Sequence, residues 1–193
     1  MSKQPPVVEV SLDADKLRSL QGVILADSYE NKFWPITLEG PRAMIPICNI
    51  PMIEYAVQFL LMNKIRHLIV FCTSFKSKIE EYFKKYRSKE ILSLQVVSSD
   101  DCKSVGDALR ELKDMQLVQG DFVLMHCETI ANFNLMPAIQ LHFSKKGKRE
   151  EGKINVLTKI YRKIGVNDPL RTELDDAVTS HQNNNNKNLF IFC

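Results

Sequence analysis

The residues best suited to chemistry form a polar loop directly after the first apolar run of the sequence. The run covers 23–26, and the loop consists of Asp27, Ser28, Tyr29, Glu30, Asn31 and Lys32. A loop at the carboxyl end of a buried strand is where open α/β sheets bind their ligands, so its position predicts a nucleotide site. Its composition argues against one, because no glycine lies between Gly22 and Gly40 to let the backbone wrap a phosphate closely.

A second set of reactive side chains lies at the end of the apolar run 121–126, where His126 is followed by Cys127 and Glu128. A metal site would need all three to point at one ion, but adjacent side chains on a strand alternate between its faces. We therefore interpret His126 as a structural histidine with satisfied hydrogen bonds. Asp107 invites an acid/base interpretation, but a place in the first turn of a helix, favoured by the helix dipole, explains it more simply.

The elements that would position these residues alternate between strand and helix patterns. The sequence predicts strands over 23–26, 67–72, 91–97, 121–126 and 154–161, with a terminal strand at 189–192. It predicts helices that start at Pro51, over 75–86 with Ser74 as cap, over 107–115 and over 136–144. Such alternation indicates βαβ crossovers. The expected fold class is α/β, with three layers and a mostly parallel, Rossmann-like sheet covered by helices on both faces.

Composition and charge are those of a globular protein. The chain has 193 residues, of which 45% are hydrophobic and 25% charged, enough to bury a core as one domain. A net charge of +3 is too small for a nucleic-acid footprint unless the positive charge is concentrated. The basic run at 145–149 is interpreted as a solvated helix end, with an RNA contact as the alternative. Direct nucleic-acid binding is not expected.

The five cysteines are widely spaced, and no two of them form a CxxC pair. This pattern fits a reducing compartment and neither a disulfide framework nor a zinc site. No apolar run approaches the roughly 18 residues of a membrane span, and the amino terminus has no signal-peptide core. We expect a cytoplasmic protein without a membrane partner.

The chain divides into a lead-in and one domain. Residues 1–18 lack a sustained period and are expected to be a flexible lead-in, and 19–193 form the domain. An asparagine-rich insert at 182–188 interrupts the last part of the domain, which we expect to be truncated at its carboxyl end.

Several motifs resemble the sugar-phosphate nucleotidyltransferase fold. They are Leu25-Ala26, Pro35, Pro41 to Pro46 and Leu124 to Asn132. The resemblance implies where active members carry their chemistry. A glycine-rich loop containing an arginine follows the first strand, a Lys-Pro pair comes a few residues later, and Gly-Asp ends the fourth strand.

Within that superfamily the chain resembles more closely the epsilon-subunit family of eukaryotic translation initiation factor 2B. The matching segments are Leu20-Gln21, Ala26-Asp27-Ser28, Phe33-Trp34-Pro35-Ile36, Pro41-Arg42, Phe71-Cys72, Ser104 to Arg110 and Asp121-Phe122. The Ala-Asp-Ser loop is the most discriminating of these, since the related gamma subunit keeps glycines there. The resemblance also implies that Phe33 and Trp34 pack in the core under the loop, with base stacking as the alternative.

A residue-by-residue comparison with the motifs of active members implies that few of the catalytic groups are kept in this sequence. Asp27 and Glu30 put negative charge where a triphosphate must sit, which is unfavourable at close range. Lys32 falls where the loop arginine would be, but it lacks the surrounding amide cradle. Arg42 follows Pro41 where active members have Lys-Pro. Glu128 replaces the aspartate and could in principle bind Mg²⁺, although the phosphate cradle is missing.

The resemblance implies a non-catalytic scaffolding domain with no cofactor and no metal. Its expected partners are other subunits of initiation factor 2B, especially gamma, and indirectly initiation factor 2. In that family guanine-nucleotide exchange belongs to a carboxyl-terminal helical-repeat domain, and no such repeat occurs in these residues. The alternative is a divergent sugar-1-phosphate nucleotidyltransferase, which would bind nucleotide and release pyrophosphate in the presence of Mg²⁺.

Overall fold

The structure is a computed structural model that describes residues 17–27, 33–86, 88–147, 158–160 and 190–192. Most of the expected lead-in, the asparagine-rich insert at 182–188 and the greater part of the predicted strand 154–161 lie outside these residues. The terminal strand predicted at 189–192 is confirmed as a strand over Phe190–Phe192.

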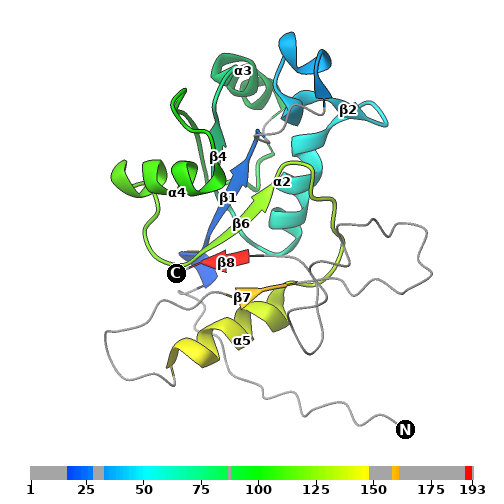
Figure 1. The fold of residues 1–193 in the computed structure, drawn as a ribbon. Helices are drawn as coiled ribbons and strands as arrows, with labels where there is room; N and C mark the ends of the chain where they lie inside the picture. The colour runs from blue at the N-terminus through cyan, green and yellow to red at the C-terminus, as the bar shows by residue number, and fades with distance from the viewer. Residues whose placement is uncertain (1–16, 28–32, 87, 148–157, 161–189, 193) are drawn as a thin grey trace, which may run out of the picture.

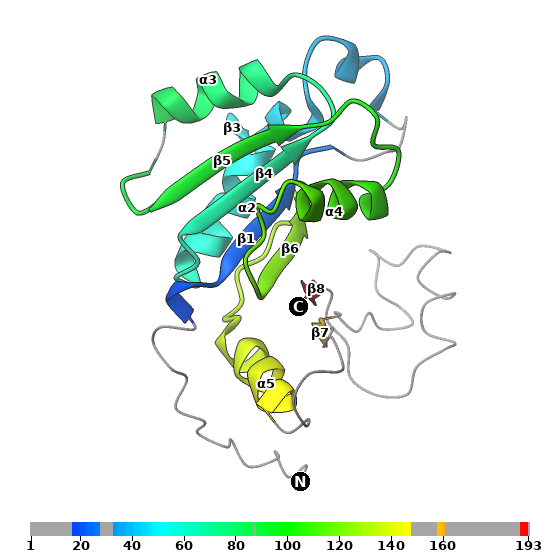
Figure 2. The same ribbon diagram turned by 90° about the vertical axis from the view of Figure 1, so that its left-hand side faces the viewer.

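One six-stranded sheet organises the described residues, with the strand order β5-β4-β1-β6-β8-β7 (Figures 1 and 2). The strands are β1 Gln21–Leu25, β4 His67–Cys72, β5 Ser93–Ser98, β6 Phe122–His126, β7 Thr158–Lys159 and β8 Phe190–Phe192. The first four strands along this order pair in parallel, whereas β8 is antiparallel to both β6 and β7. The prediction of a mostly parallel sheet is confirmed.

Strand β1 lies at the centre of the parallel part. It pairs with β4 on one side and with β6 on the other, so that Val23 lies between Ile69 and Leu124. Val23 and Ile24 face opposite sides of the sheet, and neither side chain is exposed to solvent. Because both faces of β1 are covered, its sequence is a continuous apolar run rather than an alternating one.

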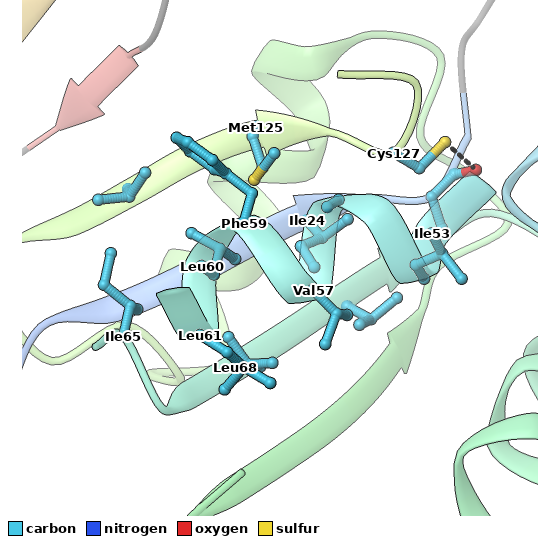
Figure 3. Packing of buried hydrophobic residues seen from close by; sticks show 14 of the residues in the cluster. Ile24, Ile53, Val57, Phe59, Leu60, Leu61, Ile65, Leu68, Met125 and Cys127 are labelled. Carbon is cyan, nitrogen blue, oxygen red and sulfur yellow. Dashed lines mark hydrogen bonds between the residues drawn. The ribbon is translucent and has the colours of Figure 1, made fainter. Parts of the chain in front are cut away.

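Helices cover both faces of the sheet, as predicted. They are α2 Met52–Met62, α3 Lys76–Tyr86, α4 Val105–Asp114 and α5 Met136–Gly147. Helices α2 and α3 pack on the face that carries Ile24 and Val70, in the cluster drawn in Figure 3. Helix α4 packs on the opposite face against Val23 and Phe71, and Figure 2 shows it on the other side of the strands from α2.

Two helix starts differ from the prediction because the caps differ. Helix α4 begins at Val105 because the side chain of Ser104 accepts a hydrogen bond from the backbone N–H of Asp107. Helix α3 begins at Lys76, and the backbone carbonyl of Phe75 accepts from Lys78 and Ile79. Phe75 therefore takes the position before the helix that the sequence suggested for Ser74.

A short hairpin that the sequence did not predict follows the loop region. Strands β2 Pro46–Ile47 and β3 Ile50–Pro51 pair antiparallel. The residues between them, Cys48 and Asn49, both have positive φ, at 50° and 64°. Two-residue hairpin turns favour this backbone, but glycine usually supplies it, so Cys-Asn gives a weak sequence signal. The 3₁₀ helices η2 Ile36–Leu38 and η3 Arg42–Met44 precede the hairpin.

No helix in the described part of the chain is both long and apolar enough to cross a membrane.

Gly22 allows α2 to approach the sheet closely, and replacing it tests that packing. A Cβ atom at Gly22 would lie 2.7 Å from Cδ1 of Leu60, which is fully buried and has little room to move. We expect Gly22→Ala to lower the free energy of unfolding by about 1–3 kcal/mol, measured by urea denaturation.

The matched control is Gly106→Ala in α4, where the new Cβ would meet no atom closer than 3.5 Å. This control should leave stability unchanged or raise it by up to about 1 kcal/mol, because glycine is a poor helix former. Equal effects of the two substitutions would contradict the close contact between β1 and α2.

Candidate functional site

The candidate site lies where the parallel strands end. The backbone N–H of Ala26 donates to the carbonyl of Phe71 at 2.8 Å, and that of Cys127 donates to the carbonyl of Leu25 at 2.9 Å. These bonds extend the pairing of β1 with β4 and β6 beyond the strand ends. The residues that follow the three strands, Asp27 among them, therefore meet at one edge of the sheet.

Asp27 links the ends of β1 and β4. Its carboxylate oxygen Oδ2 accepts a hydrogen bond from the backbone N–H of Thr73 and a second, at 2.8 Å, from the hydroxyl of Thr73. Hydrogen bonds to an ionised carboxylate are stronger than neutral ones. Asp27 therefore acts in the described structure as a clamp between two strands. The other residues of the predicted loop, Ser28, Tyr29, Glu30, Asn31 and Lys32, lie outside the described residues.

Glu128, the residue predicted at the former metal position, is paired with Arg42. The Nη2 atom of Arg42 lies 3.7 Å from Oε1 of Glu128, and the two side chains are 13% and 33% exposed. The guanidinium of Arg42 also stacks over the ring of Phe33, 4.2 Å from its centroid. A partly buried pair of this kind is less screened by solvent than a surface pair. Two of the predicted site residues are thus brought together, as an internal ion pair.

Cys127 lies beside the carboxylate of Glu128 and is shielded from solvent. Its Sγ atom is 3.3 Å from the carbonyl oxygen of Ala26 (Figure 3) and 3.4 Å from Oε2 of Glu128. Burial raises the pKa of the Cys127 thiol, and the negative charges of Glu128 and Asp27 raise it further, while Arg42 lowers it. The buried sulfur thus contacts the carboxylate of Glu128, the partner of Arg42.

Cys72, at the end of β4, is similarly protonated. Burial and the nearby charge of Asp27 raise the pKa of its thiol to about 12, and its Sγ lies 3.4 Å from the carbonyl of Val97. The folded chain holds this proton more tightly than the unfolded chain does. Cys72 therefore favours folding below about pH 9, and that contribution is lost as the pH rises towards 12.

The interpretation of His126 as a satisfied structural histidine is wrong. Its Nδ1 atom is buried and has no hydrogen-bond partner among the described residues. His126 ends β6 opposite Leu25, whose side chain packs in the apolar cluster under α4. His126 thus lies at a register position on the side of the sheet that carries this cluster.

The prediction that Trp34 packs in the core is also wrong. Trp34 is 66% exposed, and Ile36 and Leu38 in the neighbouring η2 helix are 63% and 61% exposed. Phe33 is half-buried, and the guanidinium of Arg42 covers its ring. The segment lies outside the two apolar clusters of the sheet, which explains why its aromatic side chains are not buried.

Sequence reasoning missed Thr73, the partner of Asp27. A signal existed, because Thr73 directly follows the predicted strand 67–72, and the ends of neighbouring parallel strands meet. The contact of Arg42 with Phe33 had no such signal, since it depends on how the loop returns to the sheet. In the part of the chain that the structure describes, no cluster of three or more His, Cys, Asp or Glu side chains could hold a metal ion.

Removing the clamp at Asp27 should destabilise the fold. We expect Asp27→Ala to lower the free energy of unfolding by about 1–3 kcal/mol, because it leaves the N–H and hydroxyl of Thr73 without their acceptor. Thr73→Val should lower it less, since the backbone bond remains. The exposed Asp101→Ala is the control and should change stability by less than about 0.5 kcal/mol. Urea denaturation measures all three, and an effect of Asp27→Ala no larger than the control's would refute the clamp.

The buried thiols should resist alkylation. Cys48 is exposed, whereas Cys72 and Cys127 are buried. The raised pKa of Cys72 lowers its thiolate fraction at pH 8 about a thousandfold relative to an ordinary thiol. In a Cys193→Ser background, iodoacetamide followed by peptide mass spectrometry should modify Cys48 first and the two buried thiols only after unfolding in urea. Rapid labelling of Cys127 in the folded chain would contradict the closed site.

Comparison with known proteins matches this arrangement to one family. The nucleotidyl transferase family model matches residues 21–162. The chain is 38% identical over 173 residues to the translation initiation factor eIF2B subunit epsilon of Dictyostelium discoideum, covering 87% of this chain and 24% of that protein. It is 32% identical over 163 residues to the same subunit of Schizosaccharomyces pombe, covering 83% and 24%. The predicted resemblance to epsilon subunits is confirmed, and the chain spans about a quarter of their length.

The chain is also similar to an enzyme over a shorter stretch of its length. The chain is 33% identical over 116 residues to a bifunctional sugar-1-phosphate nucleotidylyltransferase/acetyltransferase of Sulfurisphaera tokodaii, covering 58% of this chain and 27% of that protein.

Two solved structures share the fold. One is an apo UDP-glucose pyrophosphorylase, with a TM-score of 0.55 and 18% sequence identity, covering 66% of this chain and 55% of that chain. The other is HddC from Yersinia pseudotuberculosis, with a TM-score of 0.54 and 14% sequence identity, covering 63% of this chain and 53% of that chain. The described sheet and the family match agree, and the chain belongs to the nucleotidyl transferase family.

Proposed function

We propose that this chain is a non-catalytic assembly domain of an epsilon-type subunit of initiation factor 2B, the guanine-nucleotide exchange factor for initiation factor 2. Its similarity to two epsilon subunits over most of its length supports the assignment. The exchange activity itself is assigned to a carboxyl-terminal domain beyond the matched region, as the family resemblance implies.

The observation that carries the non-catalytic part of the proposal is the ion pair of Arg42 with Glu128. Metal-assisted transfer of a nucleotidyl group needs a carboxylate that is available to a divalent cation. Here the carboxylate at that position already has a cationic partner within the fold. Asp27 is similarly engaged, by Thr73. The two carboxylates that the structure describes at this edge are thus engaged within the fold rather than directed towards a ligand.

The partners of the domain follow from the same assignment. A domain that has lost its catalytic activity can be retained because it binds other proteins. We propose the gamma subunit as its direct partner and the other subunits of the factor as neighbours.

Three buried cysteines, Cys72, Cys102 and Cys127, are free thiols. This supports a reducing compartment, and we place the protein in the cytoplasm.

The alternative is a divergent sugar-1-phosphate nucleotidyltransferase. It is favoured by the match to the bifunctional enzyme of Sulfurisphaera tokodaii and by the retained carboxylate of Glu128. The two functions differ in whether the chain binds nucleotide.

Calorimetric titration with GTP and ATP in the presence of Mg²⁺ separates the two functions. We expect no saturable binding up to about 1 mM, the upper end of the usual KM range, and no release of pyrophosphate with sugar 1-phosphates. The control variant is Glu128→Ala. Micromolar binding by the unmodified chain that is lost in this variant would establish the alternative and refute the non-catalytic assignment.

Co-expression with a gamma subunit tests the assembly role. We expect the two chains to purify together as a stable heterodimer at low salt, because assembly is the function retained by the domain. Another member of the nucleotidyl transferase family that is not a subunit of initiation factor 2B, expressed in the same way, is the control. If the chain and gamma separate completely on size exclusion at low salt, the assembly proposal fails.

A further inference from the structure

The outer edge of the sheet at β5 has features of a pairing surface. Within the described residues β5 bonds only to β4, and its other side carries no strand (Figure 2). The sequence of β5, Ser93-Leu-Gln-Val-Val-Ser98, contains no charged residue and no proline. Soluble proteins usually place such residues on an edge strand to prevent pairing with another chain. The β5 edge lacks this protection.

A groove of about 460 Å³ lies between this edge and helix α3. It is lined by the apolar side chains of Phe83, Leu94 and Val96 and by the charged side chains of Glu80 and Lys84. Leu94 and Val96 are only partly buried, and both face the α3 side of the sheet. Apolar surface is therefore available directly beside the unpaired strand edge.

The opposite face of β5 is polar at its centre. Gln95 is exposed, and it alternates with the two apolar residues on either side, so it projects to the α4 side of the sheet. The strand thus presents apolar side chains on one face and an uncharged amide on the other, arranged symmetrically about Gln95.

We propose that β5 is the interface of a symmetric dimer, in which a second copy of this chain pairs its own β5 antiparallel to the first. A two-fold axis through Gln95 places Leu94 of one copy opposite Val96 of the other. Directly opposite residues of antiparallel strands share a face and pack together. The same axis brings the two Gln95 amides together, where each can donate to and accept from the other.

Charge complementarity on α3 favours a second copy over an unrelated strand. Glu80 and Lys84 line the same groove as Leu94 and Val96, the two neighbours of Gln95. The proposed two-fold axis through Gln95 therefore passes near the turn of α3 between Glu80 and Lys84. The axis reverses the direction of α3 in the second copy. Glu80 of each copy then faces Lys84 of the other, which makes two equivalent ion pairs. A self-complementary surface of this kind is what a two-fold interface requires.

The size of the surface indicates weak association. One pair of six-residue strands and one turn of each helix lie at the small end of specific interfaces, for which transient, concentration-dependent binding is typical. This dimer does not depend on whether the chain binds nucleotide, nor on its assembly with gamma.

Sedimentation equilibrium of the full chain over roughly 1–200 µM tests the dimer. We expect the dimer fraction to rise with concentration, and Gln95→Lys to weaken dimerisation at least about tenfold, because it sets two like charges against each other at the axis. Gln58→Lys on the exposed face of α2 adds the same charge elsewhere and is the matched control. A chain that remains monomeric over this range, or a dimer that Gln95→Lys leaves unchanged, overturns the proposal.

A charge-reversal cycle distinguishes this interface from any other. Glu80→Lys and Lys84→Glu should each weaken the dimer, because each sets like charges against one another across the axis. The double substitution should restore it, since the opposite charges again face one another. Urea denaturation of each variant separates a change in folding from a change in association. Failure of the double variant to recover the dimer, with folding intact, refutes the proposed pairing.

Discussion

The central strand β1 must be hydrogen-bonded along both edges and covered on both faces, and the other elements meet these requirements. Strands β4 and β6 pair with it in register, while α2 and α4 cover its two faces. The absence of a side chain at Gly22 lets Leu60 of α2 pack directly on the backbone. Because β1, β4 and β6 run in the same direction, the segments that follow them necessarily meet at one edge. The position of the candidate site is thus a consequence of the sheet, whatever residues occupy it.

The two carboxylates that the structure describes at this edge, Asp27 and Glu128, both have polar partners within the fold. Carboxylates at this partly buried edge would be unfavourable without partners, and the fold supplies these as the backbone and hydroxyl of Thr73 and the guanidinium of Arg42. Removing one member of a partly buried ion pair lowers stability more than replacing both members by apolar residues does. Asp27 and Glu128 are therefore held by contacts within the fold, and removing the partner of either would leave its carboxylate uncompensated.

Strands β1, β4 and β6 of the parallel sheet could be predicted from the sequence because each is a short, mainly apolar run. Strand β4 was predicted with its observed bounds, and β1 and β6 within two residues. The hairpin β2–β3 could not, since its strands are two residues long and its turn contains no glycine. At the site, the sequence singled out Asp27, Arg42 and Glu128, but their contacts with Thr73 and Phe33 were not predicted from it. The exposure of Trp34 was missed because an aromatic residue near the sheet is normally buried.

The antiparallel strand β8 lies between β6 and β7, although it comes last of the three in the chain. On the ribosome, β1, β4, β5 and β6 are all synthesised by residue 126, long before Phe190–Phe192 emerges. The nascent chain can therefore assemble its four parallel strands early, while one flank of β6 stays open until β8 arrives. Pairings of such long sequence separation form slowly, so for that interval the newly made domain presents a bare strand edge to chaperones and to neighbouring nascent chains.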